Sequence, residues 1–202
     1  MGSRIMHLII TKRITEHFPI EDVHSFLIGG IAPDAITSKD ASHFYKGSLE
    51  NYTRTIDYIG FIEKYKEYKT NPYVLGYFSH LVADDLWLKG FYLPWLKNRM
   101  ESNKEIFQLY HQDFRILNGK LLEFYDYNKE LNDQLQSNIE IKDLEEVKSQ
   151  DVKNFIDFVL DDMRYSNKEL VAILNVFTLQ QIIGYIETSV ERAIYFMKKL
   201  SE

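Results

Sequence analysis

The sequence contains no cysteine, and this absence excludes several kinds of chemistry at once. Disulfide bonds, thiolate metal ligands and cysteine nucleophiles cannot occur. A bound metal ion would therefore need histidine, aspartate or glutamate ligands. Because structural zinc sites usually include cysteine, a site built from nitrogen and oxygen ligands alone is more typical of catalysis.

Glycine and proline are also scarce, with 9 and 4 residues among 202. Sheets of many short strands need frequent turn residues. Here leucine, isoleucine, lysine, glutamate and tyrosine recur at helical spacings of about three to four residues, which predicts an all-α fold. At this length we expect a single domain over residues 1–202, built as a multi-helix bundle around a sizeable core.

The positions of proline, glycine and polar residues predict the limits of the helices. The second helix is expected to stop at the Gly29-Gly30 pair. Residues 31–40, which include the Ala32-Pro33-Asp34 step, and the polar segment 132–149 are expected to be irregular. The predicted helices cover residues 4–17, 20–30, 49–69, 72–94, 104–131, 151–163 and 167–199.

The chain has neither an excess of basic residues nor a long apolar run. Its 24 lysine and arginine residues face 30 aspartate and glutamate residues, a formal net charge of −6, which argues against binding to duplex nucleic acid. No segment approaches the roughly 18 to 20 apolar residues that span a bilayer, and the first ten residues lack the cleavage site of a secretory signal. We therefore expect no transmembrane segment and a cytoplasmic location.

His80 and Asp84 are four residues apart within a predicted helix, so their side chains are neighbours on one face. Tyr77, Leu81, Asp84 and Leu88 follow the spacing of a core-facing stripe, so Asp84 should point inward. A buried carboxylate is costly unless it is paired or coordinated. Two interpretations stay open for this segment alone: a pair of metal ligands, or a buried His–Asp hydrogen bond without metal.

Three further residues extend this pair into a set. His7 lies within an apolar run, Asp34 follows Pro33, and His43 lies between Ser42 and Phe44. Each alone fits an ordinary structural role, as a core histidine or a turn aspartate. Together with His80 and Asp84 they give three histidines and two aspartates on segments that a helical bundle can bring together. Such ligands suit Zn²⁺, with Mn²⁺ or Fe²⁺ as alternatives.

Four other residues have weaker claims to a site. His17 lies at a predicted helix end, where a histidine is favourable for the helix dipole, and we expect it to be structural or at the surface. His24 is the more plausible spare ligand of the two. His111 and Asp113 are two residues apart and do not share a helix face, but one of them could line a cleft opposite the metal ligands. Whether His24, His111 or Asp113 joins the site stays open.

The order and spacing of these residues resemble the zinc-dependent phospholipase C family of bacterial all-helical hydrolases. The resemblance spans about residues 5–95, within a metal-site half of about 1–100 that precedes C-terminal helices of about 101–202. It rests on His7, on FLIGGIAPD at residues 26–34, on SHF at 42–44 and on GYFSHLVAD at 76–84.

The resemblance implies a fold of the zinc-dependent phospholipase C type and a ligand set. His43, His80 and Asp84 would bind zinc, His7 would join the same or an adjacent ion, and Asp34 would be a ligand or the general base. Well-studied members that hold three metals use further histidines and a glutamate downstream. Here His111 is the only histidine after His80, and no His-x-x-x-Glu follows, so we expect one or two ions rather than three.

Two functional hypotheses follow. The first is a metal-dependent hydrolase that cleaves a small-molecule phosphoric ester, such as a phosphodiester, with metal-activated water and Asp34 as proton acceptor. The alternative is a non-catalytic helical protein whose structural metal or buried His–Asp cluster supports binding of a partner or small ligand. A third, weaker interpretation, a His-Asp helical phosphohydrolase, would require an adjacent His-Asp pair, which the chain lacks. The substrate and the oligomeric state do not follow from the sequence.

Overall fold

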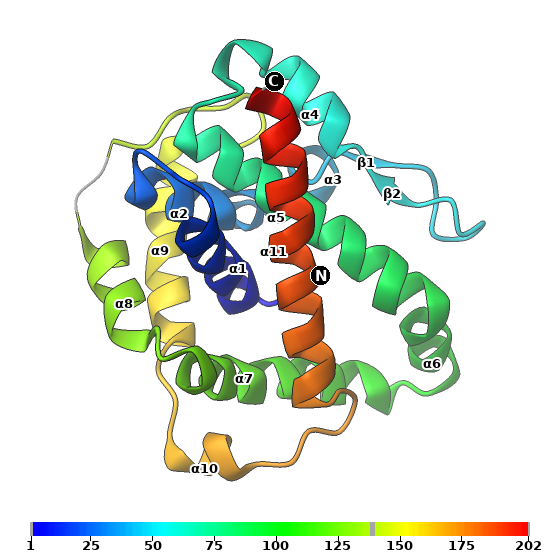
Figure 1. The fold of residues 1–202 in the computed structure, drawn as a ribbon. Coiled ribbons are helices and arrows are strands. Elements are labelled where there is room, and N and C mark those ends of the chain that lie inside the picture. The colour runs from blue at the N-terminus through cyan, green and yellow to red at the C-terminus, as the bar shows by residue number, and fades with distance from the viewer. Residues whose placement is uncertain (1, 138–139, 202) are drawn as a thin grey trace.

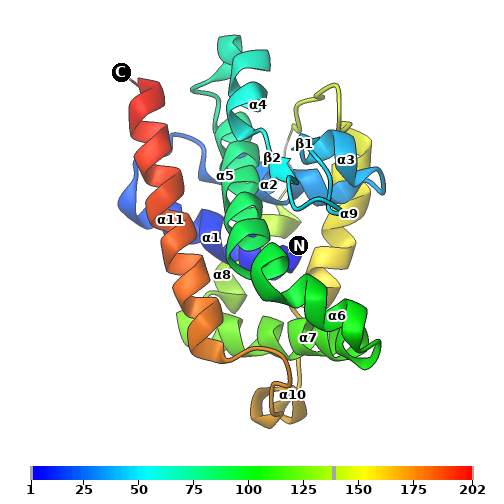
Figure 2. The same cartoon turned by 90° about the vertical axis from the view of Figure 1, so that its right-hand side faces the viewer.

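The computed structural model describes residues 2–137 and 140–201 and has the predicted all-α architecture, with one short hairpin of two strands. Figure 1 and Figure 2 show the arrangement from two sides. The helices are α1 (Arg4–His17), α2 (Val23–Ile31), α3 (Lys39–Ser42), α4 (Tyr58–Lys64), α5 (Pro72–Trp87), α6 (Lys97–Ser102), α7 (Glu105–Tyr125), α8 (Asn128–Gln136), α9 (Ser149–Asp162), α10 (Asn167–Val171) and α11 (Leu179–Ser201). The 3-10 helices η1 (Ala32–Ala35) and η2 (Lys66–Tyr68) and the π-helix η3 (Leu88–Leu96) connect some of them.

Helix α5 is the centre of the bundle. It contacts α1, α2 and α11, and both views show it running lengthwise between its neighbours. Asn71 caps its first turn by accepting a hydrogen bond from the Val74 amide, and Pro72 occupies the first turn, where no hydrogen-bond donor is needed. A helix that is apolar on nearly every side is stable only when it is surrounded, so α5 is almost entirely buried.

Helices α2 and α5 pack backbone against backbone at two glycines. A Cβ atom at Gly29 would lie 2.1 Å from the Tyr73 carbonyl oxygen, and one at Gly76 would lie 2.0 Å from that of Phe26. The Gly29-Gly30 pair therefore permits close approach and does not end the helix, because α2 continues to Ile31. The predicted loop after it is also wrong in part, since Ala32-Pro33-Asp34-Ala35 forms the 3-10 helix η1, with Pro33 in its first turn.

The helix predicted over residues 49–69 is wrong for its first half. The antiparallel strands β1 (Tyr45–Lys46) and β2 (Thr55–Ile56) precede α4. Gly47 has a φ of 70°, which favours glycine and turns the chain between the strands. The buried carboxylate of Asp85 accepts hydrogen bonds from the Thr55 hydroxyl and the Ile56 amide, so α5 holds the hairpin in place.

The helix predicted over residues 72–94 extends further than expected. α5 passes into the π-helix η3, which contains Pro94, and then into α6. Proline inside an α-helix removes one backbone hydrogen bond and clashes with the preceding turn. A local π-helical stretch relieves this conflict because its turns are wider.

Two other predicted helices are interrupted. The segment 104–131 divides at Asp126, whose φ of 55° ends α7 before α8 begins. The segment 167–199 divides into α10 and α11, and the connection between them is fastened to α7 by Asp113. Its buried carboxylate accepts hydrogen bonds from the backbone amides of Asn175, Val176 and Phe177 at 2.7–3.1 Å. Asp113 is therefore an anchor for this loop.

One hydrophobic core includes buried residues from α1 through α11. The N-terminal end of α1 points into the middle of the molecule, and α7 crosses one end of the bundle beside α1 and α11. Among the helices that the structure describes, none is long and apolar enough to cross a membrane.

Candidate metal centre

The five residues selected from the sequence come together where α1, η1, α3 and α5 meet. His7 lies on α1, Asp34 on η1, His43 directly after α3, and His80 and Asp84 on consecutive turns of α5. His7, His43, His80 and Asp84 are at most 2% exposed, so the inward orientation predicted for Asp84 is confirmed. The side chain of Asp34 is 14% exposed.

Asp84 is the centre of this cluster. Its Oδ1 lies 3.1 Å from Nε2 of His7, and its Oδ2 lies 3.3 Å from Nε2 of His43 and 3.5 Å from Nε2 of His80. Oδ1 of Asp34 lies 3.6 Å from the same nitrogen of His43. Two groups, His7–Asp34–His80 and His43–His80–Asp84, each have ligand atoms within 4.8 Å of one another. This spacing suits a shared cation.

In His43 and His80, the Nδ1 atom that faces away from Asp84 makes a hydrogen-bond contact that fixes the ring. Nδ1 of His80 lies 2.8 Å from the Gly30 carbonyl oxygen, which can only accept, so this nitrogen carries the proton and Nε2 presents its lone pair to the cluster. Nδ1 of His43 lies 2.9 Å from the Ser42 hydroxyl, and the His43 ring stacks on Tyr45. Such outer contacts fix the rings of metal-binding histidines.

His7 and Asp84 carry polar atoms that the protein leaves unsatisfied. Both ring nitrogens of His7 and Oδ2 of Asp84 are buried without a well-aligned hydrogen bond among the described residues. The His7 ring instead stacks on His80, with ring centroids 3.7 Å apart. Buried polar atoms without partners are costly and rare. A bound cation could satisfy Oδ2 of Asp84 and one ring nitrogen of His7.

The protonation states also suit a cation. Burial opposes ionisation of both carboxyl groups, but His43 and the other neighbouring positive groups keep the pKa values of Asp34 and Asp84 well below their usual range. Burial and the charge of His7 lower the pKa of His80 to about 4, so its ring is neutral near pH 7. Burial lowers the pKa of His43, but the carboxylates of Asp34 and Asp84 beside its Nε2 outweigh this effect and raise the pKa above its ordinary value. A divalent ion would take the place of the proton that His43 shares with the carboxylates.

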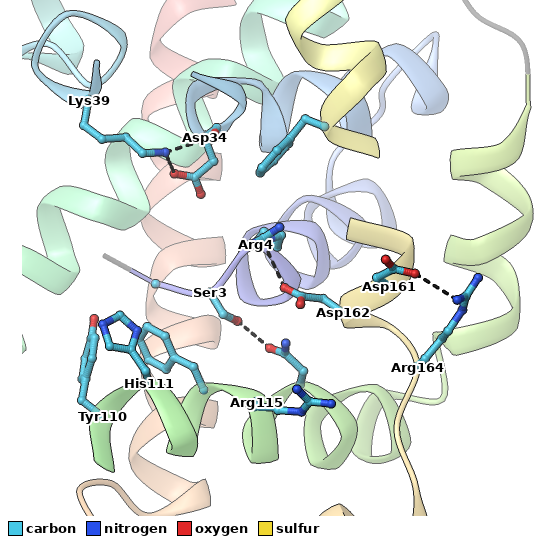
Figure 3. A pocket seen from close by; sticks show the side chains of 14 residues that line it. Ser3, Arg4, Asp34, Lys39, Tyr110, His111, Arg115, Asp161, Asp162 and Arg164 are labelled. Atoms are coloured by element: carbon cyan, nitrogen blue, oxygen red, sulfur yellow. Dashed lines mark hydrogen bonds and ion pairs between the residues drawn. The ribbon is translucent and has the colours of Figure 1, made fainter. Parts of the chain in front are cut away.

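A cavity of about 590 Å³ adjoins the cluster at Asp34. It lies between η1, α7 and α9 (Figure 3) and is also lined by Gly2, whose amide lies 3.4 Å from Oδ1 of Asp84. Asp34 is the one member of the five that lines the cavity. Its Oδ1 accepts a hydrogen bond from the Lys39 ammonium group at 2.6 Å, and its backbone oxygen accepts another at 3.0 Å.

The other four candidate residues lie outside the cluster of five. His111 lines the cavity, whereas Asp113 anchors the loop before α11. His17 is exposed in the last turn of α1, as expected, and His24 lies in the first turn of α2. None of these four belongs to either donor group found among residues 2–137 and 140–201.

Three features that support the site do not follow from the sequence pattern. Lys39 is paired with Asp34, Tyr45 covers His43, and the carbonyl group of Gly30 orients His80. The contact of a backbone carbonyl group cannot be predicted from the spacing of residue types in the sequence. The Gly29-Gly30 pair was the available signal, because it marks close packing of α2 against α5.

Comparison of this chain with family models, with curated proteins and with solved structures finds no match.

Proposed function

We propose that this protein is a metal-dependent hydrolase that cleaves a phosphoric ester, such as a phosphodiester, with zinc as the preferred ion and one or two ions bound. The observation that carries the proposal is the convergence of His7, Asp34, His43, His80 and Asp84, with buried donor atoms of His7 and Asp84 unsatisfied. A bundle of the zinc-dependent phospholipase C type would account for the same residues.

The cavity favours catalysis over a purely structural metal. Structural sites are closed by protein ligands, whereas catalytic sites keep a position open to solvent or substrate. Here four donors are buried, and Asp34 alone reaches the cavity. An ester that enters the cavity would therefore meet the centre on the side of Asp34.

Each residue of the centre would have its own role in the reaction. His43, His80 and Asp84 would hold the ion, and His7 would contribute to the same or an adjacent ion. When bound, the ion supplies a nucleophilic water at neutral pH and offsets negative charge on the phosphoryl group. Asp34, ionised and open to the cavity, would accept a proton from the attacking water at a carboxylate oxygen. The ammonium group of Lys39, beside Asp34, stabilises negative charge on the ester.

Metal content is the first test. The protein, purified without a metal column, is analysed by plasma mass spectrometry beside His80→Ala and His17→Ala. We expect one or two equivalents of zinc in the wild type, loss in His80→Ala and no change in His17→Ala. The proposal would be contradicted if none of the three samples contained zinc, or if the wild type took up no metal after reconstitution with Zn²⁺, Mn²⁺ or Fe²⁺.

The variant Asp34→Asn tests catalysis separately from metal binding. The amide keeps the shape of the side chain but cannot accept a proton. We expect the zinc-loaded variant to fold and to lose at least about 100-fold in hydrolysis of a phosphodiester such as bis(4-nitrophenyl) phosphate. If zinc is bound but wild type and variant are equally inactive against phosphodiesters and phosphomonoesters, the alternative of a non-catalytic protein with a structural metal is favoured.

A further inference from the structure

The cavity beside Asp34 carries more positive than negative side chains. Its lining includes the cations Arg4, Lys39, Arg115 and Arg164, and the carboxylates Asp34, Asp161 and Asp162. A metal ion bound beside Asp34 would offset the charge of that carboxylate, and the excess of positive charge in the cavity would then increase. A cavity of this kind attracts anions.

The cations are not equally available. Arg4 is less available to a ligand, because its Nε lies 3.0 Å from Asp162 and its guanidinium group stacks over Phe155. Within the part of the chain that the structure describes, Arg115 pairs through Nε with Glu169 at 3.0 Å, and its side chain is 81% exposed. Its two terminal nitrogens are therefore available to form the two-pronged contact that arginine makes with phosphate or carboxylate.

Arg164 provides a second available cation. It pairs with Asp161 at 3.0 Å, but both side chains are largely exposed, at 81% and 66%. Ion pairs between exposed groups are weak and exchange readily for a better partner. In Figure 3 Arg115 lies at the lower centre and Arg164 at the right, and both are away from Lys39 and Asp34 at the upper left.

The lining of the cavity also includes aromatic side chains. Tyr110, Phe114 and Phe155 line it together with His111. Aromatic rings offer apolar area for the carbon skeleton of a ligand. The cavity thus combines a metal-side end, an apolar wall and a pair of arginines.

We propose that the substrate is a small organic phosphoester with a second anionic group, which Arg115 and Arg164 bind while the reacting phosphate lies near Lys39 and Asp34. This inference rests on the proposed hydrolase function and adds the substrate class. A substrate with a cationic head group would place its charge against these arginines and is disfavoured.

Two non-hydrolysable probes test the second anionic subsite by calorimetry on the zinc-loaded protein. Phenylphosphonate carries one phosphonate group, and 1,4-phenylenediphosphonate carries two on the same ring. We expect the diphosphonate to bind at least about tenfold more tightly, beyond the twofold statistical advantage of two identical groups. In the double variant Arg115→Gln/Arg164→Gln this ratio should fall to about two, with little change for phenylphosphonate.

Arg192→Gln is the matched control, because Arg192 is exposed on α11 and is outside the cavity lining. It loses one positive charge, as each of the two substitutions in the double variant does, and should keep the full preference. The zinc content of every sample is measured in parallel. Zinc bound with a ratio of about two in the wild type would overturn the inference and leave the metal centre intact. Zinc absent and neither probe bound would overturn the proposed function and this inference with it.

Discussion

At the scale of single residues, His80 belongs to both groups of candidate metal ligands, His7–Asp34–His80 and His43–His80–Asp84. Because Nδ1 is bonded to Gly30, only Nε2 can serve either group. His80 therefore binds one ion, and a second ion would depend on His7 and Asp84. The neutral form of His80 is the form that can bind, and burial already favours it by lowering its pKa to about 4.

The metal-free protein should lose stability as the pH falls from 6.5 to about 4. In this window unfolded His80 takes up a proton and folded His80 does not, because burial lowers its pKa to about 4. The unfolded state then binds more protons, so the free energy of unfolding decreases. His43 has a raised pKa, so its contribution is complete below pH 6.5 and is constant here. Because the pKa values of Asp34 and Asp84 are lowered, their stabilising contributions are present above the ordinary pKa of about 3.8 and are lost mainly below this window.

Urea unfolding at pH 6.5 and 4.5 measures this effect, with His80→Gln as the comparison. The wild type should lose about 2 kcal/mol more than the variant between the two pH values. An equal loss in both proteins would rule out His80 as the cause.

Lys39→Met should increase the affinity of the centre for zinc. The ammonium group lies 2.6 Å from Oδ1 of Asp34 and so repels a cation at that carboxylate. Lys39 is partly exposed, which limits the interaction to about 0.5–1 kcal/mol, or roughly two- to fivefold in dissociation constant. Competition with a fluorescent chelator measures this constant. Weaker zinc binding in the variant would mean that Lys39 mainly positions Asp34.

The residue types of the candidate centre could be predicted, but their surroundings could not. The spacing of His80 and Asp84 requires them to be neighbours once a helix forms. Lys39 shows no such regularity relative to Asp34, because its contact depends on how η1 and α3 fold back on each other.

At the scale of elements, the contact between α2 and α5 determines where the ligands meet. We expect Gly76→Ala to lower the free energy of unfolding by about 1–3 kcal/mol, because its methyl group would lie 2.0 Å from the Phe26 carbonyl oxygen and force the helices apart. The carbonyl of Gly30 would move from His80, so zinc affinity should fall as well. Thermal unfolding and zinc titration measure the two effects.

Gly184→Ala is the control for this substitution. Gly184 lies within α11, and nothing is within 4 Å of the position of its Cβ. Alanine favours helix there by about 0.5–1 kcal/mol, so this variant should be slightly more stable and bind zinc normally. Similar behaviour of both variants would show that helix propensity, and not the approach of α2 to α5, governs the result.

Helices with clear caps were predictable, whereas long helices with tertiary interruptions were not. α1 begins after Ser3, which caps it, and covers the predicted residues 4–17. The residues 49–69 have helical spacing, but Asp85 on α5 pairs with the start of this segment and favours a hairpin. Similarly, Asp113 binds the backbone amides of residues 175–177 and prevents a continuous helix. Such contacts come from distant parts of the chain.

At the scale of the whole molecule, metal binding should stabilise the fold. The donors come from α1, η1, α5 and the residue after α3, so a shared ion would link elements far apart in sequence. At zinc concentrations about 100 times the dissociation constant, linkage gives about 2.7 kcal/mol. For a chain of this size this corresponds to an increase in Tm of roughly 5–10 °C.

Differential scanning calorimetry of chelated and zinc-reconstituted protein measures this increase. His80→Ala should show little or no response to zinc. An equal increase in the variant would place the stabilising ion elsewhere on the protein.

The burial of four donors has a consequence for how quickly an ion is exchanged. Because Asp34 alone among the five reaches the cavity, we expect an ion to enter and leave past Asp34 and its partner Lys39. Exchange with ions in the buffer should then be slow compared with a purification. The metal found in the isolated protein would record the supply available when the chain folded, and the order in which competing metals reached it.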